Sequence, residues 1–198
     1  MVTDAFDVNT LDSIVGTLVR SPRSITLSDY AIPCYEIKND YAVTTFSLSS
    51  KGGKALSKEI EQAIKPVIDE AVRCGYDPNL LTALYEAVLN AHQHGNGFSR
   101  EKNVTIASRF NDVSAEISVI DQGGVIPPEL ILYVLRHRQD RRVPQLDFYA
   151  FSGREKLTPE NQGLGTHFMH TYADEVKYSR SAQGGLVVHL TKYKVKRD

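Results

Sequence analysis

The order of helix-like and strand-like segments constrains the fold of this chain more than any other feature. Apolar residues recur at helical spacing from Leu56 to Val72, again from Leu80 to Ala91, and at Phe168, Met169 and Tyr172. Runs rich in β-branched and aromatic residues are typical of strands, and they lie at 41–48, 104–109, 115–121, 175–181 and 185–193. The helices and the antiparallel strands segregate in the order β-α-α-β-β-loop-α-β-β, which predicts an α+β two-layer sandwich with helices on one face of a mixed, mostly antiparallel sheet.

Glycine, proline and short polar residues mark the expected ends of these segments. Gly75 is a suitable stop for the first helix, and Pro66 inside that helix is expected to kink or split it. The pair Asp77-Pro78 predicts the start of the second helix, which we expect to end near Gly95-Asn96-Gly97. Hairpin turns are predicted at Asn111-Asp112 and Gln183-Gly184.

Two parts of the chain lie outside this regular pattern. Residues 1–40 are expected to form an N-terminal extension packed on a main domain of residues 41–198, with weak helical spacing at 11–18 and short strands at 24–27 and 35–37. A short helical stretch at 130–135 precedes a polar, basic segment that runs to Asn161 and is too long for a simple connection. Such long loops usually carry function.

Composition excludes several classes of protein. The formal net charge is −1 over 198 residues, which lacks the basic footprint of a nucleic-acid binder or of a polybasic membrane-surface protein. The two cysteines form no CxxC pair, the N-terminus does not resemble a secretory signal, and no apolar run is long enough to span a bilayer. A cytoplasmic protein with reduced thiols is expected.

The second predicted helix carries a polar stripe. Glu86, Asn90 and the pair Gln93-His94 recur at helical spacing and therefore share one face. A carboxylate one turn before a carboxamide suits two roles, since Glu86 can accept a proton from an attacking hydroxyl and Asn90 can offer its amide oxygen to Mg²⁺. The alternative is an ordinary solvated face. His92 and His94 suggest a metal site, but no third ligand is evident.

Two glycine-containing turns are further candidates for a binding site. Asp121 ends a predicted strand and is followed by Gln122-Gly123-Gly124, where a carboxylate can accept a hydrogen bond from an exocyclic amine and glycines let a flat ring approach the backbone. Gly163-Leu164-Gly165 opens the last predicted helix, where backbone N–H groups and the helix dipole favour an anion. Each motif alone is equally compatible with a plain turn.

Together these motifs resemble those of a known family. The stretch from Ala83 to Gly95, ALYEAVLNAHQHG, resembles the N-box of the GHKL ATP-binding superfamily and is most similar to that of anti-sigma factor serine kinases, E-A-x-x-N-A-x-x-H-G. Residues 117–124 resemble the first glycine box, and 163–176 the second with its following Asp-Glu-Val. Gly184-Gly185 and the strand after them resemble the closing hairpin of the family. The resemblance covers about residues 41–193.

The resemblance implies a Bergerat-type fold that binds ATP with Mg²⁺. By position, Glu86 corresponds to the catalytic base, Asn90 to the Mg²⁺ ligand and Asp121 to the residue that contacts the adenine amino group, with Gly123 beside it. The phosphate-binding turn corresponds to residues 163–166, that is Gly163, Leu164, Gly165 and Thr166. Residues 136–161 correspond to the ATP lid, whose basic residues are candidates for a phosphate clamp or for a solvated loop, and they are Arg136, Arg138, Arg141, Arg142, Arg154 and Lys156.

Three positions depart from the family pattern. Val125 stands where the first glycine box usually has another glycine, Thr166 where the second box usually has leucine, and Leu186 where the closing hairpin often has threonine. That threonine often supports the adenine contact, so Leu186 bears on nucleotide affinity.

Several functions are consistent with these observations. The first is a protein kinase of anti-sigma type that phosphorylates a serine or threonine of a small partner protein. Such kinases also bind a sigma factor in a competing complex and often form dimers. The second is a module with weak or no nucleotide binding that serves as a partner-binding surface. A detached histidine-kinase domain is a third alternative, but no histidine-bearing phosphoacceptor helix is evident in the sequence. A gyrase-type ATPase is less expected still, because it needs a transducer domain.

Overall fold

A six-stranded sheet organises the structure. The computed structural model describes residues 25–26, 34–123, 125–126, 155 and 164–194. In sheet order the strands are β2 (Cys34–Tyr35), β7 (Glu175–Ser181), β8 (Leu186–Tyr193), β5 (Ser114–Ile120), β4 (Asn103–Phe110) and β3 (Ala42–Ser47). Only the β2–β7 pair is parallel among these neighbours. The sheet is therefore mixed and mostly antiparallel, as the sequence predicts.

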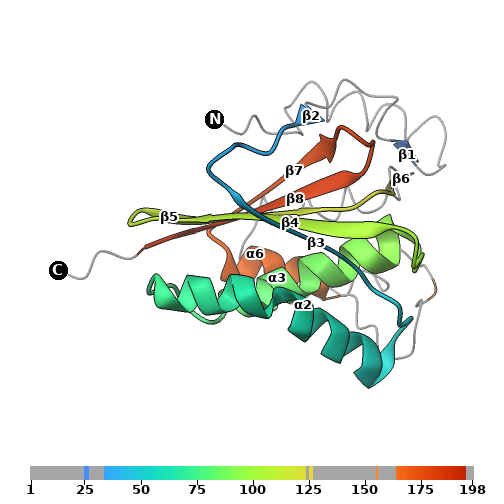
Figure 1. Cartoon of the computed structure of the whole chain (residues 1–198), viewed down its shortest axis with the longest axis horizontal. Coiled ribbons are helices and arrows are strands. Elements are labelled where there is room, and N and C mark those ends of the chain that lie inside the picture. Colours follow the sequence, from blue (N-terminus) through green and yellow to red (C-terminus); the bar gives the residue numbers. More distant parts are fainter. Residues whose placement is uncertain (1–24, 27–33, 124, 127–154, 156–163, 195–198) are drawn as a thin grey trace.

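In the described part of the chain, three α-helices cover one face of this sheet. They are α2 (Gly53–Arg73), α3 (Leu80–Asn90) and α6 (Gly165–Tyr172), and Figure 1 shows all three on the same side. A π-helical turn, η2 (Ala91–Gly95), extends α3, and a separate two-stranded sheet pairs β1 (Ile25–Thr26) with β6 (Val125–Ile126). The predicted α+β two-layer sandwich is confirmed.

The core lies between the helices and the sheet. Alternate residues of the central strands face the helices, so Ile117 of β5 and Leu190 of β8 pack against helix residues such as Ile60 and Leu84, and each is at most 1% exposed. Burying each of these side chains contributes about 1.5–3 kcal/mol. This contact fixes how α3 lies across the sheet, and α3 carries the polar stripe.

Two helix boundaries differ from the sequence-based expectation. α2 runs unbroken through Pro66, which lies on its exposed side, where water can satisfy the carbonyl that loses its partner. α3 begins at Leu80, and Asp77 caps the turn before it by accepting the Asn79 N–H on Oδ1 at 2.8 Å. The N–H groups of residues 80–82 bond to the carbonyls three positions back, so 77–79 form a tighter turn than an α-helix. Gly75, with φ of 81°, ends α2 as predicted.

The N-terminal part joins the same sheet. The strands predicted at 24–27 and 35–37 occur as the two-residue strands β1 and β2, and β2 forms the sheet edge beside β7. The helix expected at 11–18, the helix at 130–135 and the lid at 136–161, apart from residue 155, lie outside the described residues. Within the described parts of the chain, no helix combines the length and apolarity needed to cross a bilayer.

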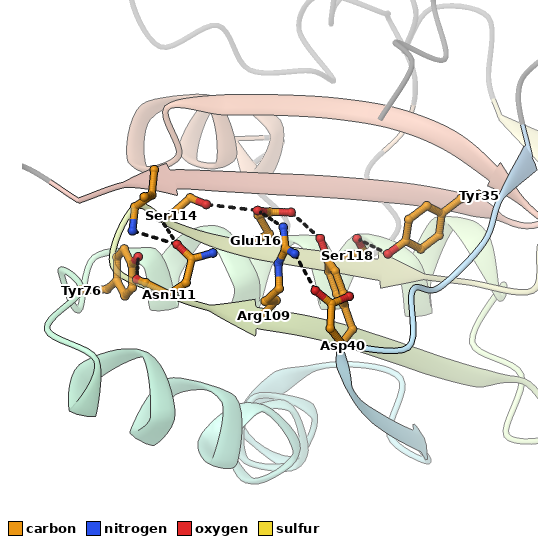
Figure 2. Close-up of polar contacts among 10 residues, drawn as sticks. Tyr35, Asp40, Tyr76, Arg109, Asn111, Ser114, Glu116 and Ser118 are labelled. Atoms are coloured by element: carbon orange, nitrogen blue, oxygen red, sulfur yellow. Dashed lines mark hydrogen bonds and ion pairs between the residues drawn. The ribbon is translucent and has the colours of Figure 1, made fainter. Parts of the chain in front are cut away.

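The face of the sheet opposite the helices carries a polar network (Figure 2). Arg109 of β4 contacts Asp40 Oδ2 and Glu116 Oε1, each at 2.6 Å, and the Tyr41 hydroxyl donates to the other Glu116 oxygen. The Arg109 guanidinium also lies over the Tyr41 ring, 5.1 Å from its centroid. These contacts join the residues just before β3 to strands β4 and β5.

A second set of contacts fastens β2 to the same face. Ser118 Oγ lies 3.1 Å from the Tyr35 hydroxyl and 2.8 Å from His189 Nδ1, and the Tyr35 ring meets the His189 ring edge-on. The other ring nitrogen of His189 lies 2.6 Å from Ser179 Oγ. Burial, with the nearby Lys177 charge, lowers the pKa of His189 to about 4, so the imidazole is neutral at pH 7. This cluster is structural in character.

Replacing Glu116 by alanine should destabilise the fold by about 1–3 kcal/mol at pH 7, because Arg109, Tyr41 and Ser114 lose a shared acceptor. Burial acts to raise the pKa of Glu116, but these hydrogen bonds outweigh it and hold the pKa below its ordinary value. The contribution is therefore present above about pH 4.3 and is lost as the pH falls through the folded-state pKa. Urea denaturation at pH 7, and again at a pH below the folded-state pKa of Glu116, checks this. Exposed Glu101→Ala is the control. An equal loss for both variants would contradict the prediction.

Candidate functional site

The polar stripe of α3 lies against the N-terminus of α6. A Cβ added to Gly165 would stand 2.6 Å from Glu86 Oε2 and 3.3 Å from Asn90 Nδ2. A side chain at this position would therefore force the Glu86 carboxylate to move. The structure thus brings together three of the residues proposed from the sequence, from segments more than seventy positions apart.

The environment of Glu86 changes its acidity. The side chain is partly buried between helices, and this desolvation raises its pKa to about 7. A carboxylate with a pKa near the working pH can both accept and release a proton, which is the property that a general base needs.

Asp121 is buried in close contact with glycine backbone. It is 4% exposed, and its Oδ1 accepts the backbone N–H groups of Gly123 at 2.8 Å and of Leu186 at 3.0 Å. A Cβ on Gly95 would stand 2.1 Å from Asp121 Oδ2, and one on Gly185 would stand 1.8 Å from the Asp121 carbonyl oxygen. These glycines let the backbone approach Asp121 more closely than a residue with a Cβ would allow.

Burial also affects the charge of Asp121. Desolvation raises its pKa to about 6, although the hydrogen bonds from Gly123 and Leu186 act in the opposite direction. The group is therefore mainly ionised at pH 7. An ionised carboxylate with its Oδ1 already held by two donors suits a further donor such as an exocyclic amine.

The Asn96 side chain holds the loop beneath Asp121, a role that the sequence motif did not reveal. Its Oδ1 accepts the Gln122 N–H at 2.8 Å and its Nδ2 donates to the Asn103 carbonyl at 3.0 Å. The residue is 3% exposed. In the sequence, Asn96 lies between Gly95 and Gly97, and this pattern predicted only the end of a helix. Instead, α3 widens into η2, and Gly95 reaches Asp121 directly.

The second glycine motif is described from Leu164 onward. The first intrahelical hydrogen bond of α6 runs from the Phe168 N–H to the Leu164 carbonyl at 3.0 Å, and Thr166 is 7% exposed. The N–H groups of the first turn of a helix have no intrahelical partner. Gly163, Gly124 and the basic lid residues lie outside the described part of the chain.

Two other proposals from the sequence meet different surroundings. His92 is fully buried, its Nε2 lies 2.9 Å from the Ser50 carbonyl, and its ring meets Phe98 edge-on, whereas His94 is exposed. The two histidines thus face different environments. Leu186 lacks the hydroxyl of the usual threonine, but its backbone exchanges hydrogen bonds with Asp121 in both directions.

A cavity of about 920 Å³ opens beside Glu86, between the N-terminal half of α2 and α3. Its walls include Lys54, Ser57, Lys58 and Glu61 from α2, and Tyr85 and Glu86 from α3. The Tyr85 hydroxyl donates to Ser57 Oγ at 2.9 Å and joins the two walls. These α2 residues could not be singled out from the sequence, because helical spacing alone does not show which other element a polar helix face contacts.

The region that holds this site is similar to known proteins. The profile of a family described as "Histidine kinase-like ATPase domain" matches residues 59–192. Two sequences of Bacillus licheniformis named "Anti-sigma F factor" are each 27% identical over 130 residues, which covers 66% of this chain and 74% of the relative. The matched region includes α3, η2, β5, α6 and the closing hairpin.

Proposed function

Because the chain belongs to the histidine kinase-like ATPase domain family, we propose that it is an ATP-dependent protein kinase of the anti-sigma type. It transfers the γ-phosphoryl group of ATP to a serine or threonine of a small partner protein. The observation that carries this proposal is Glu86, a carboxylate with a pKa of about 7 held between Asn90 and Gly165.

Asp121 is proposed to recognise the adenine amino group. The glycine backbone holds the side chain in place at close range, and the ionised carboxylate supplies the acceptor. Gly123 contributes by its close approach to Gly95, since a Cβ at Gly123 would stand 1.9 Å from the Gly95 carbonyl oxygen. This combination favours an amino group over a carbonyl at the recognised edge of the base.

The first turn of α6 is proposed to hold the phosphates. The backbone N–H groups of Leu164, Gly165 and Thr166, with Gly163 before them, are the donors that an anion would accept. Asn90 offers a carboxamide to the same space, which fits Mg²⁺, a cation that takes one or two protein oxygens and completes its shell with phosphates and water. When bound, Mg²⁺ neutralises phosphate charge.

Glu86 is proposed to take the proton of the acceptor hydroxyl. The transfer forms a bond from the acceptor oxygen to the γ-phosphorus and breaks the bond to the β–γ bridging oxygen, so that ADP leaves. The carboxylate is ionised in about half of the molecules at a pH equal to its pKa. The rate of transfer is expected to rise with pH up to about 7 and then to level off.

The regulatory part of the proposal rests on the relatives named anti-sigma F factors. We propose that the partners are proteins, a phosphorylated antagonist and a sigma factor in a competing complex, and that residues 41–198 act as the kinase domain of a cytoplasmic homodimer. Direct contact with nucleic acid or membrane is not part of this function.

A partner-binding module without strong nucleotide affinity is the second candidate. Val125 and Leu186, which replace a glycine and a threonine of the family pattern, favour it. Calorimetric titration with a non-hydrolysable ATP analogue, with and without Mg²⁺, separates the two. Magnesium-dependent binding in the micromolar range would support the kinase, and no binding at millimolar nucleotide would favour the module.

Replacing Asn90 by alanine should weaken magnesium-dependent binding of the ATP analogue by about 10- to 100-fold, since a ligand to the cation is lost. Binding measured without Mg²⁺ should change by much less. The same calorimetric titration of wild type and variant measures this difference. Asn111→Ala is not a suitable control, because the Asn111 side chain accepts hydrogen bonds that stabilise the β4–β5 turn. Gln62→Ala on the exposed side of α2 is the matched control. Equal affinities in all three proteins would exclude the metal role of Asn90.

A further inference from the structure

Glu86 lines the cavity between α2 and α3 and also lies beside the proposed phosphate turn. Gly165 closes one side of the carboxylate, where a Cβ would stand 2.6 Å from Oε2. The cavity occupies another side, and Glu86 forms part of its wall. This cavity therefore offers an acceptor hydroxyl a route to Glu86 that leaves α6 in place.

The size of the cavity suits a segment of polypeptide. Its volume of about 920 Å³ lies near the upper end of the range of about 300–1,000 Å³ that is typical of ligand pockets. Leu56 and Leu89 add apolar surface to the polar wall. The cavity can thus hold the residues on either side of an acceptor hydroxyl.

Two lysines give this cavity a charge preference. Lys54 and Lys58 are one helical turn apart on α2, and both are exposed. Neither forms an ion pair or hydrogen bond with the residues that the structure describes. By contrast, Lys65 and Arg73 further along the same helix pair with Asp69 and Glu70. Among the residues that the structure describes, the basic side chains of α2 that form no ion pair are the two at the cavity.

The backbone of α2 adds to this preference. The helix is 21 residues long, its first turn contains no acidic residue, and no side chain caps it. The preceding loop is held in place by Glu59, which accepts hydrogen bonds from the backbone and hydroxyl groups of Ser49 and Ser50. Glu61 lies one turn beyond Lys58 and limits the preference for acidic groups to the Lys54 side of the cavity.

We propose that this cavity binds the acceptor segment of the partner protein, and that Lys54 and Lys58 select a serine or threonine with acidic residues beside it. The inference rests on the proposed role of Glu86 as the base. It adds the chemical class of the substrate, which neither the family nor the names of the relatives specify.

The test is an NMR titration of the full chain with two serine peptides of equal length, one with aspartates and one with lysines beside the serine. The acidic peptide should bind about tenfold more tightly and shift the amide signals of Gly53, Ser57 and Glu86. Lys58→Glu should weaken that binding about tenfold, and Lys65→Glu, away from the cavity, should change it by less than about twofold. Calorimetry with the ATP analogue is run on each protein.

The outcomes separate this inference from the proposed function. Equal binding of the two peptides, or no shift at the cavity, would overturn the acidic preference while leaving nucleotide binding as evidence for the kinase. Weaker binding of the ATP analogue by Lys58→Glu, with unchanged peptide binding, would assign the lysines to the nucleotide instead. Failure of wild type to bind the analogue would remove the proposed function, whatever the peptides do.

Discussion

Replacing Glu86 by glutamine should lower phosphoryl transfer by about 10²- to 10⁴-fold and leave binding of the ATP analogue within about twofold of wild type. The amide has nearly the same shape as the carboxylate, so it keeps the contact with Gly165, but it cannot accept the hydroxyl proton. Transfer of labelled phosphate from ATP to the cognate partner protein measures the loss. Exposed Glu36→Gln serves as control, and unchanged turnover in Glu86→Gln would remove Glu86 as the base.

The same substitution should stabilise the fold at high pH. The folded-state pKa of about 7 lies above the ordinary value for glutamate, so wild type loses stability as the pH rises from about 4.3 to 7 and no further above 7. Glu86→Gln should therefore be more stable than wild type by about 1–3 kcal/mol at pH 8, allowing for partial solvent screening, and nearly equal at pH 4.5. Urea denaturation at the two pH values provides the test. A difference that does not depend on pH would show that desolvation of the carboxylate is not its cause.

Replacing Asp121 by asparagine should weaken ATP binding by about 10- to 100-fold and reduce the preference for ATP over GTP. The asparagine oxygen can keep the hydrogen bonds from Gly123 and Leu186, but its amide group then donates where the carboxylate accepted. An amino group on the base loses its partner, whereas a carbonyl gains one.

Calorimetry with non-hydrolysable analogues of both nucleotides checks this change, and Asp112→Asn at the exposed β4–β5 turn is the control. Because the pKa of Asp121 is about 6, the affinity of wild type for ATP should also fall as the pH drops below 6, and the asparagine variant should lack this pH dependence. An unaltered preference between the two nucleotides would count against the adenine contact.

The sequence allowed most of the fold to be predicted because its elements have strong local periodicity. The strands β3, β4, β5, β7 and β8 and the helices α2, α3 and α6 occur within a few residues of the predicted positions. α3 starts about three residues later than predicted, because i→i−3 hydrogen bonds form a tighter turn at residues 77–79. α2 is not split at Pro66, which lies on its exposed side. The proposed roles of the site residues stay predictions.

Within one helix, the sequence by itself determined that Glu86 and Asn90 share a face, because a period of 3.6 residues places positions four apart in line. It also determined that Asp121 ends a strand between turn-forming residues. These are local properties, and the backbone geometry of a single element enforces them.

Only the tertiary structure decided what these residues face. The approach of Gly165 to Glu86, the enclosure of Asp121 by Gly95 and Gly185, and the opposition of Lys58 to Glu86 across a cavity all join segments that are distant in sequence. Such contacts depend on how far apart two packed elements lie and how each is rotated, and the whole core sets both. The same packing desolvates Glu86 and Asp121, so their raised pKa values follow from the fold and not from their neighbours in the chain.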